Sequence, residues 1–204
     1  MDRTEVLRRT QEWEDVLWSD AGRIAQGWLQ GRGLTDDYIR GYHLGYTGED
    51  THRFHGCISI PVLDSRGRNR AVRFRRLEGG PKYDQPHGER PHLFNVSSVK
   101  HYVVHLTEGE FDAILLEQLG INAVGVPGAS TFRDDWRWLF VGNDVRIIFD
   151  ADKAGTDSAL AVERLLRTVA ERVAIVKLPD DHDVSSLFVE NPDELWGVLE
   201  AYDA

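Results

Sequence analysis

The sequence contains a single cysteine, Cys57, in 204 residues. One cysteine cannot form an internal disulfide and cannot supply a multi-cysteine zinc site, so both kinds of cross-link are excluded. No stretch approaches the roughly 18 consecutive apolar residues that a membrane span needs. The N-terminus is charged and lacks the apolar region of a secretion signal. We therefore expect a cytoplasmic protein of one or two domains, without a membrane partner.

Positive charge is scarce overall but concentrated in one strip. The chain carries 24 Lys and Arg against 34 Asp and Glu, and a net charge of −10 disfavours a nucleic-acid partner. Residues 66–100 reverse the balance to +6, whereas residues 101–204 carry −12. The basic strip could meet phosphates, and the clustered acids after it could hold cations.

Hydrophobic periodicity changes near residue 100. Before it, residues 5–18 and 21–30 show helical spacing. Residues 57–64 and 71–77 predict the two strands of a hairpin around a turn centred on Gly67. Residues 78–100 show no clear period and predict mostly loop. We expect a smaller α+β domain over residues 1–100.

After residue 100, strands and helices alternate. Strands are predicted at 101–107, 121–126, 145–149 and 172–178, and helices at 110–119, 133–140, 154–170 and 192–201. This order predicts an α/β domain over residues 101–204, with a parallel sheet covered by helices on both faces. Trp136, Trp138 and Trp196 fall at helical positions and are expected in the core.

Acidic residues follow three of these predicted strands. They are Glu108 with Asp112, then Asp150 with Asp152, then Asp180, Asp181 and Asp183. The carboxyl ends of parallel strands meet at one edge of a sheet, where ligands gather. Crowded carboxylates repel one another unless a cation lies between them, and oxygen ligands favour Mg²⁺ or Mn²⁺. Each acid alone could instead cap a helix, Asp183 and Asp112 above all.

Three segments resemble signatures of the TOPRIM domain. Residues 107–114 (TEGEFDAI) resemble its EGxxD motif, residues 147–155 (IIFDADKAG) its DxDxAG motif, and residues 178–188 (LPDDHDVSSLF) its later segment, where an Asp precedes an apolar helix. The resemblance implies a Rossmann-like parallel sheet with helices on both faces. It also implies a divalent metal, Mg²⁺ or Mn²⁺, at the predicted edge.

The resemblance assigns roles to single residues. Glu108 matches the family's glutamate, a proposed general acid/base and metal ligand, and Asp150 and Asp152 match its metal-binding pair. Asp183 matches the later aspartate, with Asp180 and Asp181 left as alternatives. Gly109, Asp112 and Gly155 are expected to support the site. For Gly155 a simple loop-to-helix turn is an equal alternative.

The first hundred residues resemble DnaG-type primases, especially compact phage forms. The matching segments are 29–47, the hairpin 57–77 and residues 81–95. Arginine forks match phosphate geometry, so the resemblance implies that basic side chains here bind template or nucleotides. The candidates are Arg73, Arg75, Arg76, Lys82 and Tyr83. The family has one key arginine, which Arg75 and Arg76 fit equally. A solvated edge strand protected by its charges is the alternative.

The resemblance implies a DNA primase, a nucleotidyltransferase of DNA replication that makes short RNA primers. Its partners would be a single-stranded DNA template and ribonucleoside triphosphates. The sequence shows neither the cysteine-rich zinc-binding domain nor the helicase-binding helices of full DnaG-type primases, and no P-loop. A separate zinc-finger subunit and a replicative helicase are therefore expected partners, in a bacterial cell or a phage-infected host. A metal-dependent TOPRIM nuclease and a non-catalytic DNA-binding accessory protein are the alternatives.

Overall fold

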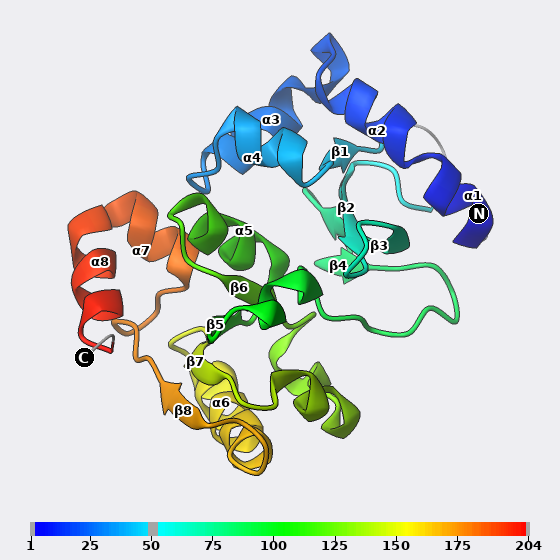
Figure 1. Ribbon diagram of the computed structural model, residues 1–204. Helices are drawn as coiled ribbons and strands as arrows, with labels where there is room; N and C mark the ends of the chain where they lie inside the picture. The colour runs from blue at the N-terminus through cyan, green and yellow to red at the C-terminus, as the bar shows by residue number, and fades with distance from the viewer. Residues whose placement is uncertain (1–2, 49–52, 203–204) are drawn as a thin grey trace. The chain divides into compact units, whose positions relative to one another are not determined.

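The computed structural model describes residues 3–48 and 53–202 (Figure 1). Contacts divide the chain into two compact units, and the division falls between His92 and Leu93, before the predicted boundary at residue 100. The segment that follows joins the second unit because Phe94 and Gly125 exchange two backbone hydrogen bonds, with N···O distances of 2.9 and 3.1 Å. Each unit is described by itself.

The first unit begins with four short helices. They are α1 (Arg3–Arg8), α2 (Thr10–Leu17), α3 (Arg23–Gln30) and α4 (Asp36–Gly41), with a 3₁₀ turn over Asp20–Gly22. The single helix predicted over residues 5–18 is divided in two at Arg9, and the Thr10 hydroxyl donates to the Leu7 carbonyl there (3.0 Å). The second piece buries Trp13 and Leu17, which accounts for the helical spacing in the sequence.

An antiparallel sheet completes the first unit. Its order is β1 (Gly45–Tyr46), β2 (Cys57–Leu63), β3 (Asn69–Arg76) and β4 (Tyr83–Asp84). The hairpin of β2 and β3 confirms the predicted strand pair. Its core is aromatic, because Phe74 stacks on Phe54 with ring centroids 4.0 Å apart and meets the Trp13 ring edge-on at 5.3 Å. Residues 78–100 hold more structure than predicted, namely β4 and a 3₁₀ helix over Val96–Lys100.

The second unit alternates strands and helices. Its elements are β5 (Val103–Thr107), α5 (Glu110–Gln118), β6 (Ala123–Gly125), 3₁₀ helices Ala129–Thr131 and Asp134–Phe140, β7 (Asp144–Ile148), α6 (Lys153–Leu166), β8 (Arg172–Ile175), α7 (Val184–Glu190) and α8 (Pro192–Glu200). The sheet order is β6-β5-β7-β8, and every pair is parallel. This confirms the predicted α/β unit with a parallel sheet, which follows a smaller α+β unit.

Helices cover both faces of the parallel sheet, with α5 and α6 on opposite sides (Figure 1). One face packs Leu106 and Ile147 against Val162 and Leu166 of α6. Side chains alternate along a strand, so Arg146 points to the other face. There it is buried and forms a bidentate ion pair with Asp144, with both N···O distances 3.0 Å. Pairing makes this buried charge tolerable.

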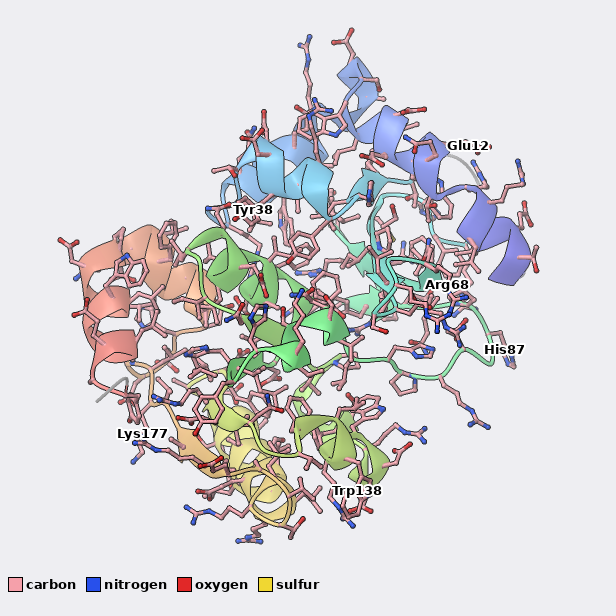
Figure 2. The ribbon with its side chains drawn as sticks, viewed as in Figure 1. Glu12, Tyr38, Arg68, His87, Trp138 and Lys177 are labelled. Atoms are coloured by element: carbon pink, nitrogen blue, oxygen red, sulfur yellow. The ribbon has the colours of Figure 1, made fainter. Side chains whose placement is uncertain are left out.

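The tryptophans only partly follow the prediction. Trp136 packs against the core of the second unit. Trp138, labelled in Figure 2, is 60% exposed, and Trp196 is 37% exposed, so the prediction that they are core residues is wrong. Trp138 lies in the 3₁₀ helix Asp134–Phe140, whose three residues per turn differ from the α-helical period on which the prediction rested. Within the described ranges, every helix is too short or too polar to cross a bilayer.

Candidate active site

Glu108 and Asp150 lie at the ends of neighbouring strands. β5 and β7 pair with Thr107 opposite Ile148. Glu108 directly follows Thr107, and Asp150 follows Ile148 after one intervening residue. Adjacent strands are about 4.8 Å apart, so both acids belong to the same carboxyl edge of the sheet. Both residues are partly buried, and the Oε2 atom of Glu108 is buried.

Asp152 combines exposure with a structural role. It is the N-cap of α6, and its Oδ1 accepts a hydrogen bond from the Gly155 backbone N–H (2.7 Å). Aspartate is among the preferred N-cap residues because its carboxylate satisfies an unpaired helical N–H group. The cap fixes one oxygen of a carboxylate that is otherwise exposed to solvent.

Gly155 is required by close packing. A Cβ atom at this position would lie 2.2 Å from the carbonyl oxygen of Asp150 and 3.1 Å from its backbone nitrogen. The first turn of α6 therefore presses directly on the main chain of Asp150. This packing accounts for a glycine where the loop turns into α6, and a direct role of Gly155 at the site stays a prediction. Gly109, in contrast, has space for a side chain, with Asp112 3.7 Å from its ideal Cβ.

The loop after β8 is bound to the same segment. The Ala151 N–H donates to the His182 carbonyl (2.9 Å), and the Asp181 N–H donates to the Ala151 carbonyl (3.4 Å). Ala151 separates Asp150 from Asp152, so both candidate ligands are attached to this loop. Asp181 has a left-handed φ of 62°, which aspartate tolerates better than most residues. The structure thus brings the second and third acidic segments together.

Asp183 begins α7 as its N-cap. Its Oδ1 accepts from the Ser186 N–H (2.6 Å), and the Ser186 hydroxyl accepts from the Asp183 N–H (2.9 Å), which forms a reciprocal capping box. The cap therefore accounts for an aspartate at this position. As with Asp152, capping and metal binding are compatible, because a carboxylate has two oxygens.

Asp112 anchors α7 to α5. Its Oδ1 accepts from both the backbone N–H (3.1 Å) and the hydroxyl (2.5 Å) of Ser185, and both residues are buried. Asp112 therefore links α5 to α7, and its support of the site stays a prediction. Sequence reasoning missed Ser185, because nothing in a single sequence indicates that a serine pairs with an aspartate 73 positions earlier.

His182 joins the two ends of its own segment. Its Nδ1 lies 2.8 Å from the Asp180 carbonyl oxygen, and its Nε2 lies 2.9 Å from Glu190 Oε2. The Glu190 carboxylate, followed by the Asp180 carbonyl, raises the pKa of His182 above its usual 6.5. Both neighbours only accept hydrogen bonds, so a doubly protonated ring satisfies both. The sequence prediction gave His182 no role.

A cavity of about 350 Å³ adjoins the acidic edge. Its lining includes Asp150 and Gly155 on one side and Lys177 and Asp180 on the other. Lys177 follows β8 and is labelled in Figure 2. The cavity lining is mainly apolar, with Leu160, Ile175 and Leu178 among its residues.

The carboxylates fit a hard divalent cation held partly by water or substrate. Over residues 3–48 and 53–202, no three His, Cys, Asp or Glu side chains converge into a ready-made metal cluster. Magnesium commonly takes only one or two carboxylates and completes its shell with water and substrate phosphates. Glu108, Asp150 and Asp152 are oxygen donors of this kind, and Asp183 belongs to the loop that binds Ala151.

The basic hairpin gives its arginines different surroundings. Arg76 donates to two main-chain carbonyls, from NH1 to His55 (3.2 Å) and from NH2 to Arg53 (3.1 Å). Arg75 lies over the Trp28 ring at 5.2 Å and the Tyr83 ring at 5.5 Å, and Arg73 lies over Tyr83 at 4.5 Å. Arg76 thus binds the main chain just before β2, whereas Arg75 and Arg73 are stacked with aromatic rings.

Trp28 was missed by sequence reasoning, because it lies on α3, far in sequence from the hairpin. Partial burial lowers the pKa of the Arg75 guanidinium, which stays charged at neutral pH because the ordinary arginine pKa is so high. Its NH1 also donates to the Lys82 carbonyl (3.4 Å). Lys82 itself is exposed and Tyr83 is partly buried. An aromatic-interleaved basic surface is typical of single-stranded nucleic-acid sites.

Comparison with known proteins identifies relatives. A family model described as Toprim-like matches residues 105–188. The Gene 57 protein of Mycobacterium phage D29 is 39% identical over 142 residues, which cover 66% of this chain and 91% of that protein. The DNA primase of Geobacillus stearothermophilus is 27% identical over 214 residues, covering 82% of this chain but only 36% of that protein. The chain thus spans about a third of the bacterial primase that it matches.

A solved structure supports the same assignment. A DNA primase domain from Pseudomonas aeruginosa superposes with a TM-score of 0.79 at 26% identity, covering 96% of this chain and 77% of that one. Both units are therefore shared with a primase domain, and the Toprim-like match falls on the unit that carries the acidic edge. The chain belongs to the family of DnaG-type primases and carries a TOPRIM domain.

Proposed function

We propose that this chain is a DNA primase catalytic core, which joins ribonucleoside triphosphates into short RNA primers on single-stranded DNA. The observation that carries the proposal is the placement of Glu108 and Asp150 on adjacent strand ends of a TOPRIM sheet, with Asp152 on the same loop. Family membership then favours nucleotidyl transfer over other phosphoryl chemistry.

The acidic edge would hold Mg²⁺ or Mn²⁺ through Asp150 and Asp152, with Glu108 as a further ligand or as the general acid/base. A cation bound there supplies charge stabilisation for a transferring phosphoryl group. Glu108 is suited to proton transfer because its carboxylate is partly enclosed next to the edge. Asp183 is a candidate for an additional ligand, and Asp180 and Asp181 are its alternatives.

The basic hairpin would bind the nucleic-acid strand or the triphosphate. Arg73, Arg75 and Lys82 supply positive charge, and Tyr83 supplies an aromatic ring. Arg76 is the weaker candidate because both terminal nitrogens of its guanidinium already donate to main-chain carbonyls. A separate zinc-finger subunit and a replicative helicase are proposed partners that would select the template and recruit the chain to it.

Primer synthesis on several single-stranded templates, with ribonucleotides and Mg²⁺, tests the proposal. We expect RNA primers from the wild type, and losses of at least about 100-fold in Glu108→Gln, Asp150→Asn and Asp152→Asn, because general acid/base and metal-ligand changes cost factors of this size. Asp157→Asn, in an exposed ion pair with Lys153 on α6, is the matched control and should stay near wild type.

Two results would contradict the proposal. Retained synthesis in all three acidic variants would overturn the site. No primer on any template, with or without added replication partners, would overturn the activity. Labelled DNA incubated with Mn²⁺ separates the alternative, since cleavage without synthesis indicates a nuclease.

A further inference from the structure

The loop between β8 and α7 is the only described segment whose main chain hydrogen-bonds to Ala151 on both sides. The two bonds are Ala151 N–H to the His182 carbonyl (2.9 Å) and Asp181 N–H to the Ala151 carbonyl (3.4 Å). Ala151 is the single residue between Asp150 and Asp152. Any movement of this loop therefore changes the spacing and orientation of the two carboxylates.

The conformation of the loop depends on the His182 ring. The loop turns tightly, because the His182 N–H donates to the Pro179 carbonyl (3.2 Å) and Asp181 is left-handed. The His182 Nδ1 faces the Asp180 carbonyl inside this turn, at 2.8 Å. Across the turn, Nε2 faces Glu190 Oε2 in the last residue of α7, at 2.9 Å. One ring thus connects the turn to the end of the helix.

The surroundings favour a geometric role over an energetic one. The His182 side chain is 22% exposed, but that of Glu190 is 72% exposed. Solvent screening makes such an exposed pair a weak contributor to stability. The contact with the Asp180 carbonyl joins residues only two positions apart, so its main effect is to select one conformation of the turn. The other end of the segment is already fixed by the Asp183 capping box and by Ser185 on Asp112.

We propose that His182 is a positioning residue for the metal site: its ring fixes the turn whose main chain holds Ala151, and so sets the geometry of Asp150 and Asp152. The inference rests on the proposed function, because it assumes that these carboxylates bind a divalent cation. His182 itself touches neither substrate nor metal in this role. Groups that orient metal ligands in this way commonly influence affinity by roughly 10- to 100-fold.

Direct Mn²⁺ binding tests the inference without an activity assay. Free Mn²⁺ is followed by electron paramagnetic resonance during titration of the full chain at one fixed pH, and Asp150→Asn identifies the binding that belongs to this site. We expect His182→Ala to raise the Kd for Mn²⁺ about tenfold. Glu190→Ala, which removes one of the two ring contacts, should raise it by a smaller factor.

Two further variants separate positioning from general damage. His182→Lys should recover most of the affinity, because an ammonium group can donate to both the carbonyl and the carboxylate. His43→Ala removes a histidine–glutamate pair of the same kind in the first unit, where His43 Nδ1 lies 3.1 Å from Glu14 Oε2. It should leave the Kd within about twofold of wild type, since that pair lies outside the loop that holds the ligands.

Each outcome decides between the two hypotheses. If the wild type binds Mn²⁺ and His182→Ala binds it equally well, with or without a lower melting temperature, the inference is wrong and the metal site stands. If His182→Ala does not fold, Glu190→Ala decides in the same way. If the wild type itself does not bind Mn²⁺, the proposed metal site is wrong and the inference is wrong with it.

Discussion

Ser185 donates two hydrogen bonds, from its backbone N–H and from its hydroxyl, to the same carboxylate oxygen of Asp112. This contact joins the first helix after the Glu108 strand to the helix after the last acidic loop. Asp112→Ala would leave the buried Ser185 groups without their acceptor, which costs about 2 kcal/mol. We expect the free energy of unfolding, measured by urea denaturation, to fall by this amount.

The Ser185 side of the contact gives a graded comparison. Ser185→Ala keeps the backbone bond and loses only the hydroxyl bond, so about 1 kcal/mol is expected. Asp157→Ala removes a carboxylate from an exposed pair with Lys153 and should change stability by less than about 0.5 kcal/mol. An Asp112→Ala variant as stable as Asp157→Ala would show that the buried contact is unimportant.

Asp152 has two roles that different substitutions separate. Asparagine caps helices about as well as aspartate, so Asp152→Asn should leave the melting temperature near wild type while it abolishes Mn²⁺ binding. Asp152→Ala should lose the cap as well and cost about 1 kcal/mol of stability. Calorimetry and thermal unfolding measure the two effects side by side. Equal Mn²⁺ affinity in wild type and Asp152→Asn would limit Asp152 to capping.

Gly155 is constrained by the main chain of Asp150. Gly155→Ala should destabilise the protein by about 2 kcal/mol, as overpacking does, because its Cβ would lie 2.2 Å from the Asp150 carbonyl oxygen. It should also weaken Mn²⁺ binding, since Asp150 must move. Gly197→Ala is the matched control: nothing lies within 4 Å of its ideal Cβ in α8, and helix propensity predicts a gain of up to about 1 kcal/mol. Similar effects of the two substitutions would contradict this packing.

Arg75 and Arg76 should behave differently when each is changed to alanine. Arg76→Ala removes the fork on the Arg53 and His55 carbonyls and should mainly lower stability, by about 1–2 kcal/mol. Arg75→Ala should mainly weaken binding of single-stranded DNA and reduce the slope of log K against log salt by about 0.7, the value for one phosphate contact on a single strand. Fluorescence anisotropy at several salt concentrations measures the slope. A reduced slope in Arg76→Ala alone would reverse the assignment.

The hairpin turn should weaken in acid. Asp64 accepts from the Arg66 and Arg68 N–H groups (2.9 and 3.0 Å), and the Arg68 side chain, followed by its backbone, lowers the pKa of Asp64 from 3.8 to about 2. A lowered pKa means that the carboxylate stabilises the fold above about pH 4 and that this contribution is lost as the pH falls through 2. The stability difference between wild type and Asp64→Asn should therefore shrink over this range. A difference that is constant from pH 5 to pH 2 would contradict this.

The sequence by itself determined the order of elements and the residues at the strand ends. Alternating apolar runs set the parallel sheet, because buried strands and covering helices have different periods. Glu108 directly follows its strand, and Asp150 and Asp152 come within four residues of theirs, so local pattern was sufficient to place them at one edge. The sequence also indicated the basic hairpin by its glycine turn and its arginines.

Only the tertiary structure decided which side chains act on one another. The bond between Asp112 and Ser185, the pairing of Ala151 with the His182 loop and the stacking of Arg75 on Trp28 all join residues far apart in sequence. No local propensity encodes such partners, because they depend on how elements pack. The same holds for Gly155. A side chain is excluded at this position because the backbone of Asp150 lies against it. Periodicity in the sequence indicates which residues are buried, whereas the tertiary structure decides which residues they contact.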